Sequence, residues 1–216
     1  MMIGNELWLI RVRMNVRNRE ARRDLRNVGE LHRTVMSMFP DVSDDDARQS
    51  MGVLHRLDSI NERPVLLVQA WVQPNPNALP QGYGDAALTS LIPLMEILKE
   101  GLMVRYRLTV NATKRPRSGP MSGKRIALGA EGTRAWWVER APEAGLLLVD
   151  APTLVSETLI GASSNDARLT LRPWRIDGVA SISDVGQLTT KLRVGMGRGR
   201  AYGCGLLSVA VLKPDS

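Results

Sequence analysis

Leu7-Trp-Leu-Ile-Arg-Val-Arg-Met14 begins with apolar residues and then alternates charged and apolar side chains. This period of two predicts a β-strand with one buried face. Asn27, with Glu30 three residues later, predicts a capped helix start, and apolar residues follow at helical spacing. The apolar segments 53–58 and 64–72 predict two further strands. The first half of the chain therefore has the order strand, helix, strand, strand.

The second half shows the same order of elements. Residues 102–110 predict an alternating strand, residues 111–124 a basic loop, and residues 132–140 a helix. The remaining candidates are strands at 146–149, 169–174, 179–182 and 206–212 and a helix at 185–192. Residues 73–84 are rich in turn-forming residues, and the segment around 85–98 is expected to link the halves.

Two units of this kind predict an α+β fold of two tandem ferredoxin-like domains, the architecture of RNA-recognition motifs. The first domain is expected to span residues 1–92 and the second residues 93–216. No sequence repeat relates the two halves, so this prediction rests on the order of the elements alone.

The composition favours a globular protein with an acidic partner. The chain has 216 residues, of which 44% are hydrophobic, and a net charge of +7. No apolar run approaches the roughly 18 residues that cross a bilayer, and the N-terminus lacks the pattern of a secretion signal. We therefore expect a cytoplasmic protein without a membrane partner. With Cys204, His32 and His55 as its only cysteine and histidines, the chain is expected to carry no zinc or other metal site and no cofactor.

The positive charge is clustered. Residues 11–26 hold seven arginines against two acids, residues 101–130 hold seven basic residues and no acid, and residues 168–200 form a third basic group. A solvated surface usually mixes the two signs, so these stretches predict a basic face that binds a polyanion. Aromatic residues make up only 4% of the chain. Base stacking on the sheets is therefore weakly supported, and binding should depend on phosphates and RNA shape.

The segment Gly195-Met-Gly-Arg-Gly-Arg-Ala-Tyr-Gly-Cys-Gly-Leu-Leu-Ser208 places arginines between glycines. Glycines permit positive φ and close backbone approach, exposed N–H groups in such loops bind anions, and guanidinium groups suit phosphate. The loop is expected to hold a phosphodiester chain. The alternative is a glycine-rich hairpin before the last strand.

Three stretches together resemble the CasE family, the endoribonucleases that mature CRISPR RNA in type I-E systems. The first is Arg19-Glu-Ala-Arg-Arg-Asp-Leu25 followed by Glu30-Leu-His-Arg-Thr34 and Phe39-Pro40. The second is Arg105-Tyr-Arg-Leu-Thr-Val-Asn-Ala-Thr-Lys-Arg115 followed by Gly123-Lys-Arg125, and the third is the glycine-rich ending. They occur in the family's order over nearly the whole chain.

The resemblance implies two tandem ferredoxin-like domains that recognise the stem-loop of the CRISPR repeat transcript. It implies one metal-independent cut at the 3′ base of that stem, leaving a 2′,3′-cyclic phosphate and a 5′-OH. The enzyme is expected to retain its product and to join the other subunits of the Cascade surveillance complex.

His32 is the expected catalytic residue. Cleavage by the neighbouring 2′-OH needs one proton removed and one delivered, and histidine titrates near neutrality. Its place in the first turns of a helix favours the neutral base. Family members often carry a tyrosine three residues earlier, where this chain has Gly29. The partner group is then missing or comes from elsewhere, with Tyr83 and Tyr202 as candidates, and Arg33 could stabilise the phosphorane.

The remaining residues are expected to bind RNA or to build the fold. Residues 155–176 are the candidate for a thin basic hairpin that enters the deep groove of the stem. The expected RNA contacts are Arg23, Arg33, Lys114, Arg115, Arg117, Lys124, Arg125, Arg168, Arg172, Gly197, Arg198, Gly199 and Arg200. His55 and Trp136-Trp137 are expected to be structural, and Asp44-Asp45-Asp46 to open a helix.

Two alternatives stay open at this point. Gly29 keeps alive a non-catalytic RNA-hairpin-binding subunit of the same surveillance complex. The charge alone would also suit a basic nucleic-acid-binding protein without sequence preference, which binds any strand with steep salt dependence.

Overall fold

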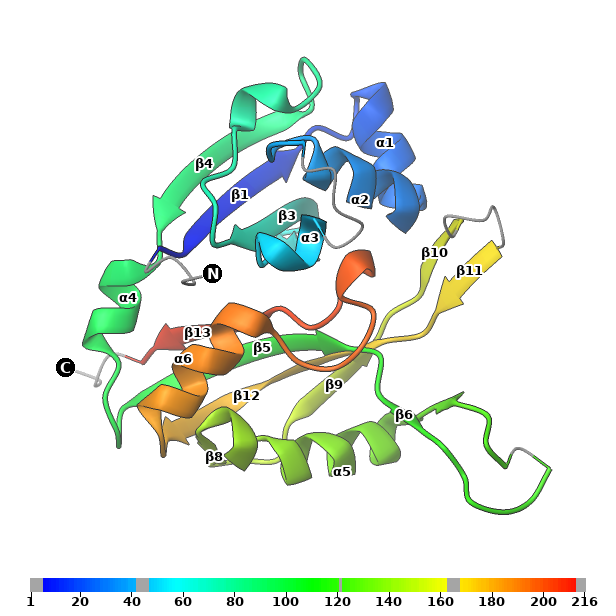
Figure 1. Ribbon diagram of the computed structural model, residues 1–216, viewed down its shortest axis with the longest axis vertical. Helices are drawn as coiled ribbons and strands as arrows, with labels where there is room; N and C mark the ends of the chain where they lie inside the picture. The colour runs from blue at the N-terminus through cyan, green and yellow to red at the C-terminus, as the bar shows by residue number, and fades with distance from the viewer. Residues whose placement is uncertain (1–5, 42–46, 121, 163–167, 213–216) are drawn as a thin grey trace.

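The computed structural model describes residues 6–41, 47–120, 122–162 and 168–212 and places them around two antiparallel sheets, one above the other in Figure 1. The first sheet consists of β1 (Trp8–Met14), β2 (Leu54–Ile60), β3 (Arg63–Ala70) and β4 (Gly84–Ser90), in the order β2-β3-β1-β4. This is the strand order of a ferredoxin-like domain. Helices α1 (Arg19–Arg26), α2 (Val28–Met36) and α3 (Ala47–Ser50) lie between β1 and β2, and the short helix η1 (Pro76–Ala78) precedes β4.

The second sheet repeats the order as β13-β5-β12-β8. Its strands are β5 (Met103–Val110), β8 (Leu146–Leu148), β12 (Trp174–Ile182) and β13 (Leu207–Val211), with β9 (Thr153–Ser156) also paired to β12. Helices α5 (Ala130–Arg140) and α6 (Val185–Val194) follow β5 and β12. The prediction of tandem ferredoxin-like units is confirmed.

Two hairpins extend from the second unit. The strands β10 (Leu159–Ala162) and β11 (Arg168–Leu171) pair antiparallel, and so do β6 (Thr113–Lys114) and β7 (Ile126–Ala127). The short helices η2 (Pro142–Ala144) and η3 (Arg200–Tyr202) complete this half. Figure 1 shows both hairpins reaching away from the sheets on the same side of the molecule.

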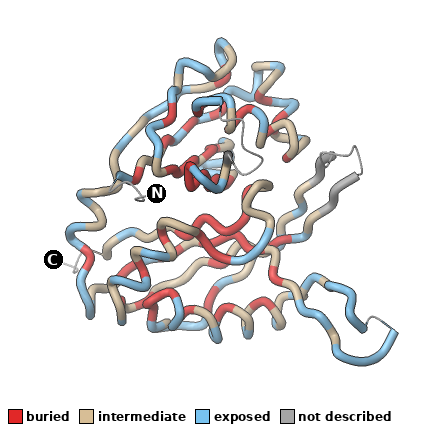
Figure 2. The backbone as a smooth tube through the Cα atoms, viewed as in Figure 1, coloured by how far each residue is buried: buried red, intermediate tan, exposed pale blue. Residues whose placement is uncertain are grey.

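Alternation along β1 sorts its side chains between two faces. Ile10, Val12 and Met14 are buried beneath the helices, whereas Arg11 and Arg13 are exposed on the other face. The second half has its own core, which surrounds the buried Trp137. In Figure 2 the buried residues follow the sheets and their helices, and the loop between β6 and β7 is largely exposed.

The segment 85–98 was expected to be a link, and this expectation is wrong for its first part. Strand β4 pairs along β1 from Trp8–Ser90 to Met14–Gly84. Its sequence Gly-Asp-Ala-Ala-Leu-Thr-Ser has little apolar alternation, because an exposed edge strand needs few buried side chains. The connection between the sheets is α4 (Ile92–Ile97), so the expected domain boundary falls at its start.

The expected strand 169–174 is also divided. Strand β11 ends at Leu171 and β12 begins at Trp174, so Arg172-Pro173 separates the hairpin from the sheet. Proline lacks the N–H that a continuing ladder requires. The same β12 includes residues 179–182, which were expected as a separate strand.

Asn27 ends one helix and begins the next. Its side chain accepts hydrogen bonds from the N–H groups of Gly29 and Glu30, which confirms the expected N-cap. Glu30 does not close a capping box, because its carboxylate pairs with Arg23 and Arg33 instead. The short break at Asn27 fixes the position of α2 and of the histidine it carries. The expected helix start at Asp44-Asp45-Asp46 lies outside the described residues.

Candidate active site and nucleic-acid interface

His32 lies in the middle of α2, half-buried, with its ring over that of His55 on β2. The ring centroids are 6.2 Å apart and the planes differ by 26°. Burial lowers the pKa of His32 below its ordinary 6.5, and the positive charges of Arg48 and Arg33 lower it further. The imidazole is therefore neutral at physiological pH and able to accept a proton.

His55 packs against His32 from the core of the first unit. It is completely buried, and burial, with His32 and Arg48 nearby, lowers its pKa to about 3. Neither of its ring nitrogens has a hydrogen-bond partner among the described residues. A histidine that stays neutral in the core packs as a flat, rigid platform, which fits the structural role expected for it.

The structure separates the two tyrosines considered as partners for His32. Tyr83 is buried, and its hydroxyl donates a 2.8 Å hydrogen bond to Oδ2 of Asp24. Burial and the Asp24 charge raise its pKa far above the ordinary value. Tyr83 is thus committed to the core of the first unit.

Tyr202 comes to the same helix from the other end of the chain. Helix η3, which carries it, contacts both α2 and β2. Tyr202 lines a cavity of about 50 Å³ with Val28 and Leu31 of α2. A Cβ built on the following Gly203 would lie 3.8 Å from the His55 ring. The glycine-rich loop therefore brings η3, which carries Tyr202, against the two elements that carry the histidines.

The glycine-rich loop has the conformation that its sequence predicts. All five glycines of the loop have φ between 71° and 89°. The backbone N–H groups of Gly197, Arg198 and Gly199 form no hydrogen bond within the described part of the chain. Free N–H groups in such a loop can receive an anion.

A hollow of about 280 Å³ lies against this loop. Arg198 and Arg200 line it together with Lys191 and Arg140, and Glu143 is the acid at its rim. The Arg200 guanidinium also reaches the Gly195 carbonyl oxygen at 3.5 Å. Four cationic side chains and the free N–H groups give this hollow the donor set of a phosphate site.

Helix α1 presents an arginine-lined groove, and of its lining residues only Arg23 was among the expected RNA contacts. Its lining is Arg19, Arg22, Arg23, Arg26 and Asn27. Arg23 is held by Asp24, Glu30 and Thr34, and Arg33 pairs with Glu30. Arg19, Arg22 and Arg26 form no ion pair with a residue that the structure describes. The density of arginine in residues 19–26 could have indicated them as RNA contacts.

The remaining expected RNA contacts lie on the two hairpins. Lys114, Arg115, Arg117, Lys124 and Arg125 are exposed on the β6–β7 loop. Strand β11 begins at Arg168, and the exposed Arg172 follows its end. Strand β10 contacts both α1 and α2, so the β10–β11 hairpin stands beside the helix that carries His32.

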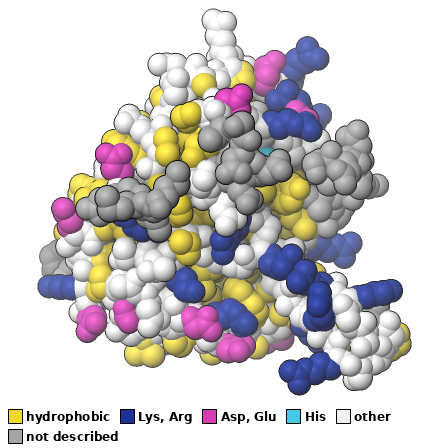
Figure 3. Space-filling model, viewed as in Figure 1, with side chains coloured by type: hydrophobic (Ala, Val, Ile, Leu, Met, Phe, Trp, Pro, Cys, Tyr) yellow, Lys and Arg dark blue, Asp and Glu magenta, His cyan; other side chains and the backbone are white. Residues whose placement is uncertain are grey.

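Figures 1 and 3 place these elements along one side of the molecule. Helix α1, the β10–β11 hairpin and the β6–β7 loop follow one another down the right of the view, and basic side chains gather at its upper and lower parts. The glycine-rich loop lies between the sheets. The structure thus brings His32 within reach of the hairpin and the glycine loop, although these segments are far apart in sequence.

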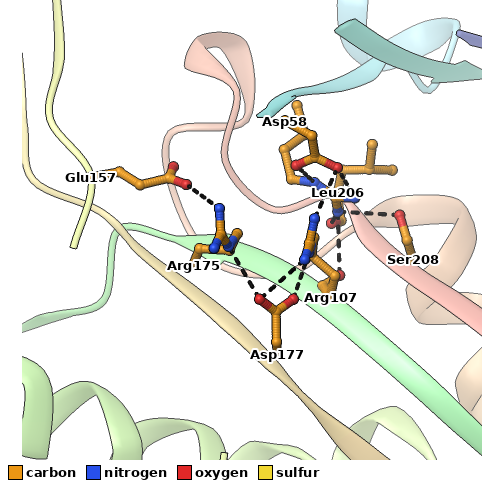
Figure 4. Close-up of polar contacts among 8 residues, drawn as sticks. Asp58, Arg107, Glu157, Arg175, Asp177, Leu206 and Ser208 are labelled. Carbon is orange, nitrogen blue, oxygen red and sulfur yellow. Dashed lines mark hydrogen bonds and ion pairs between the residues drawn. The ribbon is translucent and has the colours of Figure 1, made fainter. Parts of the chain in front are cut away.

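A chain of ion pairs fixes the two sheets against each other. Arg56 on β2 pairs with Asp58 at 2.8 Å and donates to the Leu206 carbonyl and the Ser208 hydroxyl. The network continues through Arg107, Asp177, Arg175 and Glu157 to the foot of the β10–β11 hairpin (Figure 4). This network fixes the position of the first unit, which carries the histidines, relative to the loops of the second unit.

Two further properties of the described residues concern the expected partners. No helix there is both long and apolar enough to cross a membrane. Among the same residues, no three His, Cys, Asp or Glu side chains lie close enough together to hold a metal ion.

Comparison with known proteins identifies similar chains. A family model described as CRISPR associated protein matches residues 7–211. A CRISPR-associated endoribonuclease, Cse3 of Thermus thermophilus, is 30% identical and is aligned over 94% of this chain and 100% of its own length.

Solved structures of Cse3 superpose on this chain as well. Cse3 bound to a 19-nucleotide RNA has a TM-score of 0.79 at 31% identity, covering 95% of this chain and 100% of that one. The Thermus thermophilus Cse3 bound to an RNA that represents a pre-cleavage complex has a TM-score of 0.78 at 31% identity, covering 95% and 99%. A chain of a CRISPR RNA-guided surveillance complex has a TM-score of 0.68 at 28% identity, covering 95% and 100%.

Proposed function

The chain belongs to the family of CRISPR-associated proteins whose model covers residues 7–211, and from this membership we propose how its residues cut CRISPR RNA. It is a CasE-type endoribonuclease, as the 30% identity to Cse3 over nearly the whole chain indicates. The observation that carries the mechanism is the neutral His32, set between the β10–β11 hairpin and the glycine-rich loop. The proposed cut lies at the 3′ base of the repeat stem.

His32 acts as the base in this proposal. Its neutral imidazole takes the proton of the 2′-OH, and the 2′-oxygen attacks the adjacent phosphorus. The bond from phosphorus to the 5′-oxygen breaks, and that oxygen leaves with a proton. The products are a 2′,3′-cyclic phosphate and a 5′-OH, and the step consumes neither water nor a metal ion.

Tyr202 is the proposed second group. Its family counterpart beside the histidine is absent because Gly29 occupies that position. Tyr202 lines one cavity with Val28 and Leu31 of α2, whereas the hydroxyl of Tyr83 is bonded to Asp24. A phenol can donate a hydrogen bond to a phosphate oxygen or pass a proton to the leaving group.

The RNA stem is proposed to lie along the side formed by α1, the hairpin and the β6–β7 loop. A two-stranded hairpin is thin enough to enter the deep, narrow groove of A-form RNA. Arg168 and Arg172 are the proposed contacts of the hairpin with the RNA, and the basic β6–β7 loop would follow the backbone. Gly197, Arg198, Gly199 and Arg200 would hold phosphates near the cut.

The product is proposed to stay bound and to enter a surveillance complex with other protein subunits, in the cytoplasm. Support comes from the similarity to a chain of a CRISPR RNA-guided surveillance complex. A large basic surface releases RNA slowly at physiological salt, because many phosphate contacts must break together.

The decisive test uses a labelled repeat hairpin in EDTA, beside the same RNA with a 2′-deoxy nucleotide before the expected cut. We expect a single cut at the stem base that the deoxy substitution abolishes. His32→Ala should stop cleavage and leave hairpin affinity unchanged. Tight binding without any cut by the unaltered protein would instead support a non-catalytic hairpin-binding subunit.

A scrambled hairpin separates sequence-selective binding from general attraction to nucleic acid. We expect the repeat hairpin to stay bound at a salt concentration that releases the scrambled one. Equal release of both RNAs would favour a basic protein without sequence preference.

A further inference from the structure

A second arginine-lined hollow lies on the face of the first sheet that the helices do not cover. It has a volume of about 820 Å³ and is lined by Arg11, Arg13 and Arg63 with Asn15 and Asn61. The register explains the grouping. Arg13 lies opposite Val65 on β3, two residues from Arg63, so the three side chains share one face.

The positive charge of this groove is not neutralised within the protein. Arg11, Arg13 and Arg63 are exposed, and none forms an ion pair with a residue that the structure describes. Asp85 is the acid among the lining residues, and it lies opposite Arg13 on β4 without pairing with it. Three arginines against one acid leave the groove with a net positive charge, so it is complementary to an anionic chain.

The chain leads from this hollow to α1 through the short turn at residues 15–18. Asn15, at its end, donates a side-chain hydrogen bond to the Gly82 carbonyl, and Asn18 both caps α1 and donates to the Gln81 carbonyl. The exposed Arg17 lies in the turn between them. Helix α1 and its arginine-lined groove begin directly after this turn. Arginines therefore follow one another along the chain from the open face of the sheet to the helical face.

The course of these arginines from one face of the domain to the other favours single-stranded over double-stranded nucleic acid. A duplex is stiff over about 150 base pairs in the case of DNA, and it cannot turn from one face of a small domain to the other. A single strand can follow the turn. The asparagines and the planar guanidinium groups also suit unpaired bases, which arginine can stack upon.

We propose that Arg11, Arg13 and Arg63 hold the phosphate backbone of single-stranded RNA that flanks the repeat stem. The inference rests on the proposed function, because it takes the stem to be bound on the side of α1 and the β10–β11 hairpin. The sheet face thereby adds affinity for the unprocessed transcript without touching the cut itself.

Binding of two RNAs tests the proposal. One is the repeat hairpin alone, and the other is the same hairpin with a single-stranded flank. Arg11→Gln combined with Arg13→Gln should weaken binding of the flanked RNA by about tenfold. The same change should lower its salt slope by about 1.4, since each phosphate contact to a single strand contributes about 0.7. Affinity for the bare hairpin and its cleavage should not change.

The matched control is Lys99→Gln combined with Arg105→Gln, which removes two exposed charges elsewhere on the chain. It should leave both affinities unchanged. The proposal would be overturned if the Arg11 and Arg13 variant lost affinity equally for both RNAs, or lost none. If the variant kept its RNA affinity but no longer assembled with the other subunits, the groove would bind an acidic protein instead.

The proposed function can fail separately. If the unaltered protein did not bind the bare hairpin, that result would count against the proposed function, and titration with the single-stranded flank alone would still test the groove.

Discussion

The histidine pair shows how one residue's environment sets its chemistry. His32 and His55 have the same side chain, but His55 is completely buried and His32 is only half-buried. Both pKa values are lowered by burial, and only His32 is placed where a substrate can reach it. The residue expected to be catalytic from its sequence context is therefore also the one that the fold leaves accessible.

The lowered pKa of His32 predicts the pH dependence of cutting. A base must be neutral, so the single-turnover rate should rise with pH and level off above the pKa of His32. The midpoint should lie below the ordinary 6.5, because burial and the charges of Arg48 and Arg33 disfavour the imidazolium. A rate that falls with pH over the same range would assign His32 as the acid instead.

Tyr202 and Tyr83 provide a matched pair of substitutions. Tyr202→Phe should lower the single-turnover cutting rate by about 100-fold, the lower end of what proton transfer contributes, with hairpin affinity unchanged. Tyr83→Phe should leave the rate unchanged and lower the free energy of unfolding by about 1–3 kcal/mol, because Asp24 loses its buried donor. An unaltered rate in Tyr202→Phe would show that cleavage proceeds without this phenol.

At the scale of the element, the glycine-rich loop depends on its backbone conformation. Gly205 has φ of 89°, and a Cβ there would lie 2.5 Å from the Met196 carbonyl oxygen. The loop is closed by a hydrogen bond that the Met196 N–H donates to the carbonyl oxygen of Gly205. The two ends of the loop, Gly195 and Gly205, are thus held together by contacts that leave no room for a side chain.

Gly205→Ala should therefore displace the loop and weaken RNA binding. Gly101→Ala is the control, since Gly101 has φ of 78° but no atom within 4 Å of an added Cβ. The control should cost about 1–2 kcal/mol of unfolding free energy from the left-handed backbone alone. Gly205→Ala should cost more than the control and lose hairpin affinity, as urea titration and a binding assay would measure. Equal costs for the two would mean that the loop absorbs the side chain.

At the scale of the whole molecule, the position of one sheet over the other decides whether a site exists. His32 belongs to the first unit, and the glycine loop and the β10–β11 hairpin belong to the second. The buried Arg56–Asp58 pair, whose side chains are 3% and 5% exposed, lies where β2 meets Leu206 and Ser208. The network in Figure 4 extends this contact to Arg175 and Glu157.

Arg56→Met should destabilise the protein by about 3 kcal/mol, because the buried Asp58 charge loses its 2.8 Å partner and keeps only Arg107 at 3.6 Å. Adding Asp58→Leu should recover part of that loss. Glu139→Gln, which removes an exposed pair with Arg140, should change the unfolding free energy by about 1 kcal/mol or less. Urea unfolding measures all three, and a small effect of Arg56→Met would show that the interface is held by its apolar contacts.

The amino-acid sequence by itself determined the order of elements, the N-cap at Asn27 and the left-handed glycines, and it singled out His32 as the candidate base. These follow from local periodicity, capping and steric rules, which act between residues close in the chain. Only the tertiary structure placed β4 at the edge of the first sheet, committed Tyr83 to a hydrogen bond with Asp24, and brought Arg11 and Arg13 together with Arg63. The pairing of strands and packing of sheets join residues far apart in sequence, and those contacts leave no local pattern.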